Sequence, residues 1–299
     1  MKNITITLFL SIIISCSSSS KKIDTSTISE NNELYIVNID DTAIEDYIYL
    51  SSFFKDVETI ILETNDDCLI GEVNSLRVLD NYIIVTDRKI ANSIFIFDKK
   101  GNFLHKIGQI GQGPGEYINI SDSSIDFEKN EIYLLDFASD EVLKYNISSG
   151  EFIKSIYLNN SDYDNFYIQY INNKIYASAI PFSKTENSFL LQEFDVNTGD
   201  VKASYLDAQR YNKGWNSLYT RPDGFFYPSE DGSAKYVQMF MDTVISITDD
   251  KLTPYLVVKS NNWIGEKDIR DLLEYRMVNN GDLSNEVLFE RNISYNINE

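Results

Sequence analysis

Short apolar runs alternate with polar turns along most of the chain, at the spacing of β-strands. Residues 82–87 and 93–98 are typical: six residues each, rich in β-branched and aromatic side chains, and bounded by polar turns. The turn of the following hairpin contains a glycine, and this glycine recurs at Gly101, Gly150 and Gly199, so the period is 49 residues. Such regular recurrence predicts a repeat protein built from β-hairpins.

Four copies of the unit can be followed. Three are clear, at 74–107, 124–156 and 166–199, and a looser fourth has expected strands at 217–220, 225–227 and 243–252. Four short strands per repeat of ~40–50 residues are typical of β-propeller blades, and the faces of such blades are buried only when neighbouring blades pack together. We therefore expect an all-β fold, a propeller of four-stranded blades occupying residues 34–299.

The start of the chain is typical of an export signal. Residues 1–15 hold a short basic start and an apolar run of 11 residues, too short for the ~20 residues that cross a bilayer as a helix. The run ends at Ser15–Cys16, which resembles the bacterial lipobox, so we expect cleavage before Cys16 and a lipid on its thiol. An ordinary signal peptide with an incidental cysteine is the alternative. Residues 16–33 are polar and read as a flexible tether.

The end of the chain departs from the repeat. Residues 266–278 show helical spacing in Ile269, Leu272, Leu273 and Met277, which predicts a helical insertion. Residues 288–295 then look like the start of a further blade. From residue 57 onward about five periods fit, so we expect a C-terminally incomplete propeller, with a five-bladed ring as second choice.

One glycine-rich motif stands between the first two repeats, at 108–117. It lacks the Lys-Ser or Lys-Thr of a phosphate-binding loop and the following helix of a dinucleotide site. Two interpretations remain: a structural loop between blades, or a binding loop in which Gly113, Glu116 and Tyr117 contact a ligand.

These motifs together resemble the six-bladed β-propeller lipoproteins of Gram-negative anaerobes, a family with NHL-like repeats. The resemblance covers residues 57–258 and rests on the lipobox, on 62–64 followed by Ile70–Gly71, on Phe97–Asp98 with Gly101, and on 108–117. It implies a protein held in the outer membrane by its lipid, on the periplasmic or the surface face, and coupled to nutrient acquisition.

Charge and composition exclude several functions. With 26 basic and 46 acidic residues the net charge is −20, which disfavours nucleic acid as a partner. Multi-histidine metal sites are excluded because His105 is the single histidine. We expect its side chain at the surface. Calcium remains open because Asp-rich loops occur at 40–41 and 66–67. With Cys16 lipidated, Cys68 has no disulfide partner and is expected to be buried and inert.

The candidate site residues come from the innermost strands, which face the axis of a propeller. They are Arg77, Asp126, Gln169, Tyr219 and Arg221. Acidic and aromatic surfaces suit sugars or peptides, so a binding or protein-interaction module is the first hypothesis for function.

A hydrolase or lyase that uses paired carboxylates is the alternative function. Because the chain has 46 acidic residues, no single pair can be distinguished, and the sequence points to no catalytic residue. Asp87 and Asp136 lie one period apart at strand ends, where we expect them to cap turns and not to catalyse a reaction.

Overall fold

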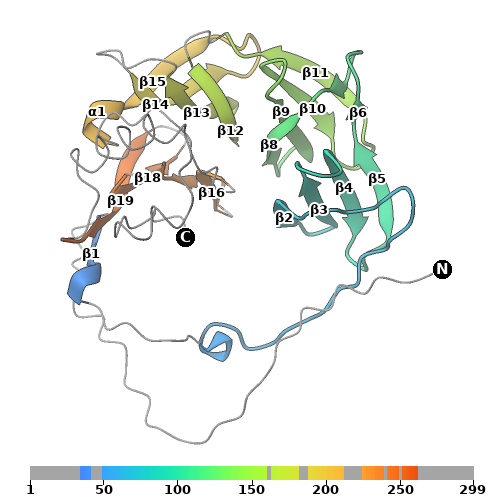
Figure 1. Ribbon diagram of the computed structural model, residues 1–299, viewed down its shortest axis with the longest axis horizontal. Helices are drawn as coiled ribbons and strands as arrows, with labels where there is room; N and C mark the ends of the chain where they lie inside the picture. Colours follow the sequence, from blue (N-terminus) through green and yellow to red (C-terminus); the bar gives the residue numbers. More distant parts are fainter. Residues whose placement is uncertain are drawn as a thin grey trace, which may run out of the picture.

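The computed structural model describes residues 34–41, 49–159, 163–181, 188–211, 224–229, 231–238, 241–248 and 251–261. These residues form four antiparallel sheets of four consecutive strands each, which we call blades 1 to 4 in chain order. In each blade the first strand lies nearest the centre of the assembly, and the blades follow one another around that centre (Figure 1). The described part of the chain is thus all-β in a propeller arrangement, as the repeat predicts.

The strands of the blades have the following bounds. Blade 1 consists of β2 (Ser75–Val78), β3 (Tyr82–Asp87), β4 (Ser93–Asp98) and β5 (Phe103–Ile107), and blade 2 of β8 (Ile120–Asp126), β9 (Glu131–Asp136), β10 (Glu141–Asn146) and β11 (Phe152–Tyr157). Blade 3 consists of β12 (Tyr163–Ile171), β13 (Lys174–Pro181), β14 (Phe189–Asp195) and β15 (Val201–Asp207), and blade 4 of β16 (Phe226–Pro228), β17 (Ala234–Tyr236), β18 (Thr243–Ile247) and β19 (Leu252–Lys259).

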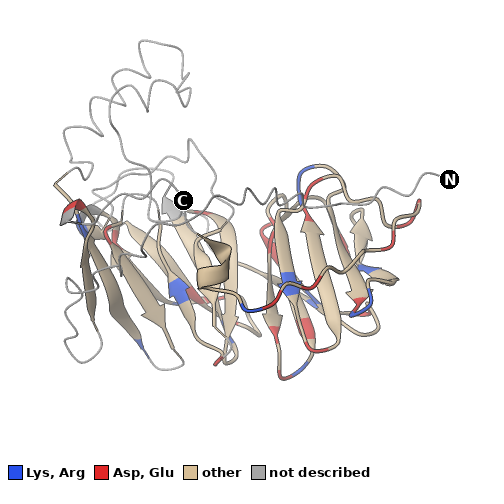
Figure 2. Ribbon diagram, turned by 90° about the horizontal axis from the view of Figure 1, so that it is seen from below, with Lys and Arg blue, Asp and Glu red and all other residues tan. Residues whose placement is uncertain are grey.

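Short elements lie outside this pattern. They are β1 (Tyr35–Asn38), the two-stranded pair β6 (Gln109–Ile110) and β7 (Glu116–Tyr117), the 3-10 turns η1 (Ile39–Asp41) and η2 (Leu50–Ser52), and α1 (Ala208–Tyr211). Charged residues are concentrated at strand ends and turns (Figure 2). No helix in the described ranges is long and apolar enough to cross a membrane.

The hydrophobic cores lie between the blades. Strand β9 shows how the sequence builds them, because its side chains alternate between two faces. Ile132 and Leu134 join the cluster shared with blade 1, whereas Tyr133 and Leu135 join the cluster shared with blade 3. A third cluster fills the space between blades 3 and 4. Both faces of a middle strand are therefore buried, which explains its nearly continuous apolar sequence.

Asp87 and Asp136 cap equivalent positions in blades 1 and 2, as the sequence predicts. Oδ2 of Asp87 accepts hydrogen bonds from the backbone amides of Gly71 (2.7 Å) and Glu72 (2.9 Å), in the segment that enters β2. The Asp136 carboxylate accepts from the amides that enter β8, at Ile118 and Asn119. Both carboxylates are buried, so each satisfies backbone groups that would otherwise lose their hydrogen bonds to water.

The fourth repeat differs from the expected assignment. Residues 225–227 were expected to form the second strand, but β16 is the innermost described strand and pairs with β17, which the sequence pattern did not reveal. The expected first strand, 217–220, lies outside the described residues, as do residues 1–33, the helix expected at 266–278 and the expected strand at 288–295.

The sheet of blade 4 gains a fifth strand from the other end of the chain. β1 pairs with β19 in parallel, with Tyr35 opposite Leu256 and Asn38 opposite Lys259. The rings of Tyr35 and Tyr255 meet edge to face, 5.3 Å apart. This pairing covers the outer edge of β19, which would otherwise expose unpaired backbone groups.

Residues 60–70 cover the face of blade 1 that is turned away from blade 2. Ile60, Leu62 and Ile70 pack against a cluster that contains Phe95 and Cys68. Cys68 is buried, as expected, and burial raises the pKa of its thiol. His105 is not a free surface residue, because Nε2 lies 2.9 Å from the backbone oxygen of Ile147 in the next blade.

Candidate functional site

A polar cavity of about 240 Å³ lies where the first turns of blades 2, 3 and 4 converge. Its walls come from residues 125–129, from 169–173, and from 228–229 and 231–233. All three stretches occupy the same place in their blades, at the turn between the first and second strands. The repeat therefore brings together three segments that are about 45 to 60 residues apart in sequence.

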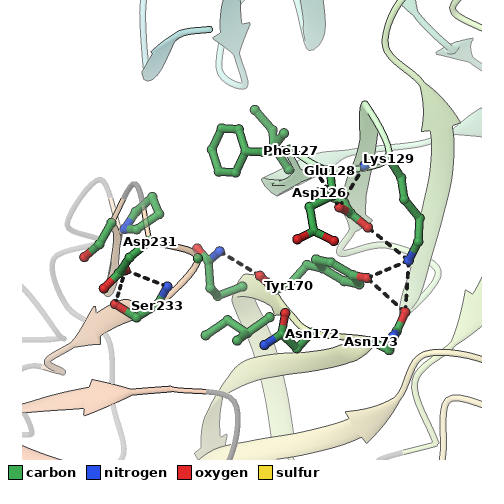
Figure 3. A pocket seen from close by; sticks show the side chains of 15 residues that line it. Asp126, Phe127, Glu128, Lys129, Tyr170, Asn172, Asn173, Asp231 and Ser233 are labelled. Atoms are coloured by element: carbon green, nitrogen blue, oxygen red, sulfur yellow. Dashed lines mark hydrogen bonds and ion pairs between the residues drawn. The ribbon is translucent and has the colours of Figure 1, made fainter.

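A hydrogen-bond network around Lys129 joins blade 2 to blade 3 on one side of the cavity (Figure 3). The ammonium nitrogen of Lys129 donates to the hydroxyl oxygen of Tyr170 (3.2 Å) and to Oδ1 of Asn173 (3.0 Å). It also lies 3.3 Å from Oδ2 of Asp126. The hydroxyl of Tyr170 donates in turn to Oδ1 of Asn173 (3.1 Å).

Asp126 is held in its charged form by this network. Burial opposes ionisation, but the Lys129 amide, the Tyr170 hydroxyl and the Lys129 ammonium outweigh it, so the pKa of Asp126 lies below its usual value. The pKa of Lys129 is raised by its hydrogen bond to Tyr170 and by its contact with Asp126. The pair is therefore ionised at neutral pH and fixed before any ligand arrives.

The opposite wall is formed by the turn of blade 4. Oδ1 of Asp231 accepts hydrogen bonds from the Ser233 hydroxyl (2.6 Å) and the Ser233 amide (3.0 Å), and these bonds lower the pKa of Asp231. Figure 3 shows Asp231 and Ser233 across the cavity from Lys129 and Tyr170.

Polar and aromatic groups share the lining. Besides Asp126 and Asp231, Glu128 adds a third carboxylate, and Lys129 is the one cation among the lining residues. Phe127 is about half exposed at the rim, and the Tyr170 ring stacks on Tyr133 with centroids 4.6 Å apart. The cavity thus combines hydrogen-bonding groups with a net negative charge and ring surface.

Two of the residues singled out in the sequence line this cavity. Asp126 and Gln169 both do so, and the side-chain amide of Gln169 donates to the backbone oxygen of Tyr170 (3.0 Å). Arg77 lies on β2 of blade 1, away from the cavity lining, and donates to the backbone oxygen of Leu76. Tyr219 and Arg221 lie outside the described residues.

The glycine-rich motif forms a self-contained loop between blades 1 and 2. Oε2 of Glu116 accepts from the Gly113 amide (2.8 Å), and Oε1 accepts from the side chain of Gln109. Tyr117 is buried, and its hydroxyl donates to the backbone oxygen of Asn92 (3.1 Å). Gly113, Glu116 and Tyr117 therefore come together in a loop stabilised by its own carboxylate, separate from the cavity.

Lys129, Tyr170, Asn173, Asp231 and Ser233 were not singled out from the sequence. The candidates from the sequence lie on the innermost strands, which face the ring axis, whereas these residues lie at or beside the turns. The one sequence feature that could have indicated them is their shared place in the repeat, at the turn between the first and second strands. In the part of the chain that the structure describes, no group of three or more His, Cys, Asp or Glu residues is arranged to hold a metal ion.

Comparison with known structures supports the fold. A Bacteroides fragilis protein named for its expected export has 22% sequence identity and a TM-score of 0.63, over 86% of this chain and 67% of that one. A DUF4221 family member from Bacteroides vulgatus has 14% identity and a TM-score of 0.47, over 67% of this chain and 62% of that one. At 22% identity the likeness to the Bacteroides fragilis protein extends to the fold alone.

A comparison with curated proteins finds no match. A comparison with protein families finds a match that covers all of the described residues. The family described as "Domain of unknown function (DUF4934)" matches residues 34–294, and this chain belongs to it.

Proposed function

We propose that this protein is a lipid-anchored β-propeller of the bacterial outer membrane that acts as a binding module, with the cavity between blades 2, 3 and 4 as its ligand site. The observation that carries the proposal is the convergence of three turns on one preorganised polar cavity. Binding sites of this kind are concave, and a few fixed polar groups determine the orientation of the ligand.

The chemistry of the cavity favours a neutral, hydroxyl-rich ligand such as a glycan. Three carboxylates and one ammonium make an anionic ligand unfavourable. The carboxylates of Asp126 and Asp231 already have partners, so the site offers fixed hydrogen-bond acceptors and does not hold an unpaired charge. Phe127 provides exposed ring surface on which an apolar sugar face can stack. A peptide is the second ligand class that these groups suit.

The anchor is supported by the sequence. The lipobox ending at Cys16 and the polar stretch 16–33 would place the propeller on a tether at the membrane. The likeness to a protein named for its export agrees with this location. A further blade or blades of the six-bladed NHL-like pattern would complete the ring.

A binding screen tests the function directly. We expect saturable binding of the purified mature chain to members of a neutral oligosaccharide array, and at least tenfold weaker binding by Glu128→Gln and by Lys129→Met. Lys202→Met is the matched control, because Lys202 is about equally exposed and also pairs with an aspartate, Asp195 (3.4 Å), away from the cavity.

Two results would contradict the proposal. Binding that is unchanged in Glu128→Gln and Lys129→Met would move the site elsewhere. Turnover of a bound glycan or peptide, abolished by substitution of a single carboxylate, would replace the binding module with the hydrolase or lyase.

A further inference from the structure

Tyr170 connects the cavity to the hydrophobic core behind it. Its side chain is buried in the cluster between blades 2 and 3, while its hydroxyl belongs to the hydrogen-bond network around Lys129. Its ring stacks on the ring of Tyr133, with 13° between the two planes. Tyr133 is buried and is not among the residues that line the cavity. The place of one cavity group therefore depends on a ring that has no contact with the cavity itself.

A buried ion pair lies beside Tyr133. Nζ of Lys144 is 2.6 Å from Oε2 of Glu131, and both side chains are mostly buried. The same nitrogen lies 5.4 Å from the centroid of the Tyr133 ring, within the range of a cation–π contact. Lys144 is also directly opposite Tyr133 in the pairing of β9 with β10. Because charges attract more strongly where water is excluded, these contacts hold the Tyr133 ring in one place.

Blade 3 repeats this arrangement with the two charges exchanged. Tyr176 holds the place of Tyr133, and Glu193 lies opposite it on β14, as Lys144 lies opposite Tyr133 on β10. Nζ of Lys174, at the start of β13, is 3.6 Å from Oε1 of Glu193. The Tyr176 hydroxyl also donates to Oε2 of Glu193 (3.3 Å). A tyrosine and an ion pair thus recur at equivalent positions of two blades.

Blade 1 is built differently at the same positions. Ile84 and Ile96 lie opposite each other on β3 and β4, and both belong to the apolar cluster between blades 1 and 2. The propeller fold therefore does not require a tyrosine and an ion pair here. Among the described blades, the arrangement faces the core between blades 2 and 3 and the core between blades 3 and 4. These are the three blades whose turns form the cavity.

Stability does not explain the buried charges. Removing two charges from water is costly, and well-packed apolar residues in their place often leave a protein equally stable or more stable. A role in the cavity does explain them. A group that is already fixed loses little conformational entropy when a ligand binds, so a firmly held cavity wall favours binding.

We propose that Tyr133 and the ion pair beside it position Tyr170 and, through Tyr170, the Lys129 network for ligand binding. The inference rests on the proposed function of the cavity and adds positioning residues that do not touch the ligand. A stacked ring has few alternative places, so the Tyr170 hydroxyl stays where it accepts from Lys129 and donates to Asn173.

Proton exchange at the Lys129 ammonium tests the proposal without any ligand. We expect Tyr133→Ile, which copies Ile84 of blade 1, to speed exchange of these protons with water at least threefold, as measured by NMR at pH 6. Tyr133→Phe keeps the ring and should restore slow exchange. Tyr145→Ile is the matched control and should leave the exchange unchanged, because Tyr145 is equally buried in the same blade but packs in the core shared with blade 1.

A second variant keeps the ring and removes the ion pair. Lys144→Met combined with Glu131→Gln should speed the Lys129 exchange at least twofold. Replacing both partners leaves no unpaired buried charge, so this variant is expected to fold even where Tyr133→Ile does not.

Ligand binding is the second measurement. The probe is the neutral oligosaccharide that the unaltered chain binds most tightly in the array. Its Kd should rise at least fivefold in Tyr133→Ile and should stay the same in Tyr133→Phe and Tyr145→Ile.

Several results would overturn the proposal. Unchanged Lys129 exchange in Tyr133→Ile, or in the double variant if Tyr133→Ile does not fold, would show that the core does not position Tyr170. An equally large effect in Tyr145→Ile would show a general loosening of blade 2. Normal oligosaccharide binding by Tyr133→Ile would contradict the positioning role alone, whereas an unaltered chain that binds no oligosaccharide would contradict the proposed function and leave the exchange result to decide the positioning role.

Discussion

His105 and Lys154 make the same contact one repeat apart. Nε2 of His105 lies 2.9 Å from the backbone oxygen of Ile147, and Nζ of Lys154 donates to the backbone oxygen of Val196 at 2.9 Å. Each contact joins the outermost strand of one blade to the hairpin of the next, and the donors and acceptors are both 49 residues apart. A side chain at the same position of the repeat therefore joins the outer edges of neighbouring blades in both cases, although it is a histidine in blade 1 and a lysine in blade 2.

Replacing His105 should loosen this joint. We expect His105→Ala to lower the free energy of unfolding by about 1 kcal/mol, the usual net worth of one hydrogen bond. His105→Lys, which copies Lys154, should recover most of the loss. Urea denaturation of the three proteins measures the effect, and an alanine variant as stable as the original would show that the contact contributes nothing.

Asp87 should be costly to replace. Its carboxylate accepts from three backbone amides, those of Gly71, Glu72 and Ile90. Asp87→Ala leaves these donors without their partner and should cost about 2–4 kcal/mol. Thermal unfolding of Asp87→Ala measures this loss, with Asp98→Ala at an exposed hairpin as the control. A loss of stability that is as large in Asp98→Ala would show that the burial of Asp87 is not the reason for its cost.

The same carboxylate should contribute to acid sensitivity. Burial opposes ionisation of Asp87, but the backbone hydrogen bonds outweigh it, and its pKa is lowered. Because the folded-state pKa lies below the unfolded one, the stabilisation is present above the unfolded value of ~4 and is lost as pH falls through the folded value. Unfolding free energies at pH 7 and pH 3 should therefore differ less in Asp87→Asn than in the unaltered chain. An equal loss of unfolding free energy between pH 7 and pH 3 in both proteins would show that Asp87 does not contribute to acid sensitivity.

Asp122 should behave in the opposite way. Burial raises its pKa to about 6, although its carboxylate accepts from the Ile168 amide of the next blade (2.9 Å). A raised pKa means that the folded state binds the proton more tightly, so stability from this group rises as pH falls from about 6 towards ~4. Asp122→Asn keeps the acceptor and removes the charge, and should stabilise the protein at pH 8 but not at pH 4. The positive charges of Arg88 and Arg77 act against the effect of burial on Asp122, and lower stability of the variant at pH 8 would show that their attraction to the carboxylate outweighs burial.

Cys68 should report whether residues 60–70 stay on blade 1. Its thiol is buried, its pKa is raised by burial, and it donates to the backbone oxygen of Glu63 (3.3 Å). We expect labelling by a thiol reagent at pH 8 to be at least 100-fold slower than in urea. Ile60→Ala, which weakens the packing of the segment, should speed labelling without unfolding the blades. Rapid labelling of the unaltered protein would show that the segment detaches readily.

The sequence was informative about the repeat because the repeat has local causes. Glycines at the hairpin turns and alternating apolar positions in strands such as β9 are visible in a few consecutive residues. Asp87 and Asp136 could be assigned as caps for the same reason, since each follows a strand at the same period.

The remaining features depend on contacts between distant segments. β1 is only four residues long, and nothing in 35–38 indicates a parallel partner at 256–259. β17 has three residues, too few for a periodic signal. The cavity could not be predicted in full from the sequence, because Lys129, Asn173 and Asp231 each look like ordinary turn residues. Only the arrangement of the blades around the ring places them around one cavity.

The most direct test of the ligand site is to follow the backbone amide resonances of the chain while neutral oligosaccharides are added. We predict saturable shifts concentrated at Lys129, Asn173 and Ser233, and none with uronic acid oligosaccharides of the same length. Shifts that are confined to other blades, or that are as large with the acidic oligosaccharides, would contradict a neutral glycan site between blades 2, 3 and 4.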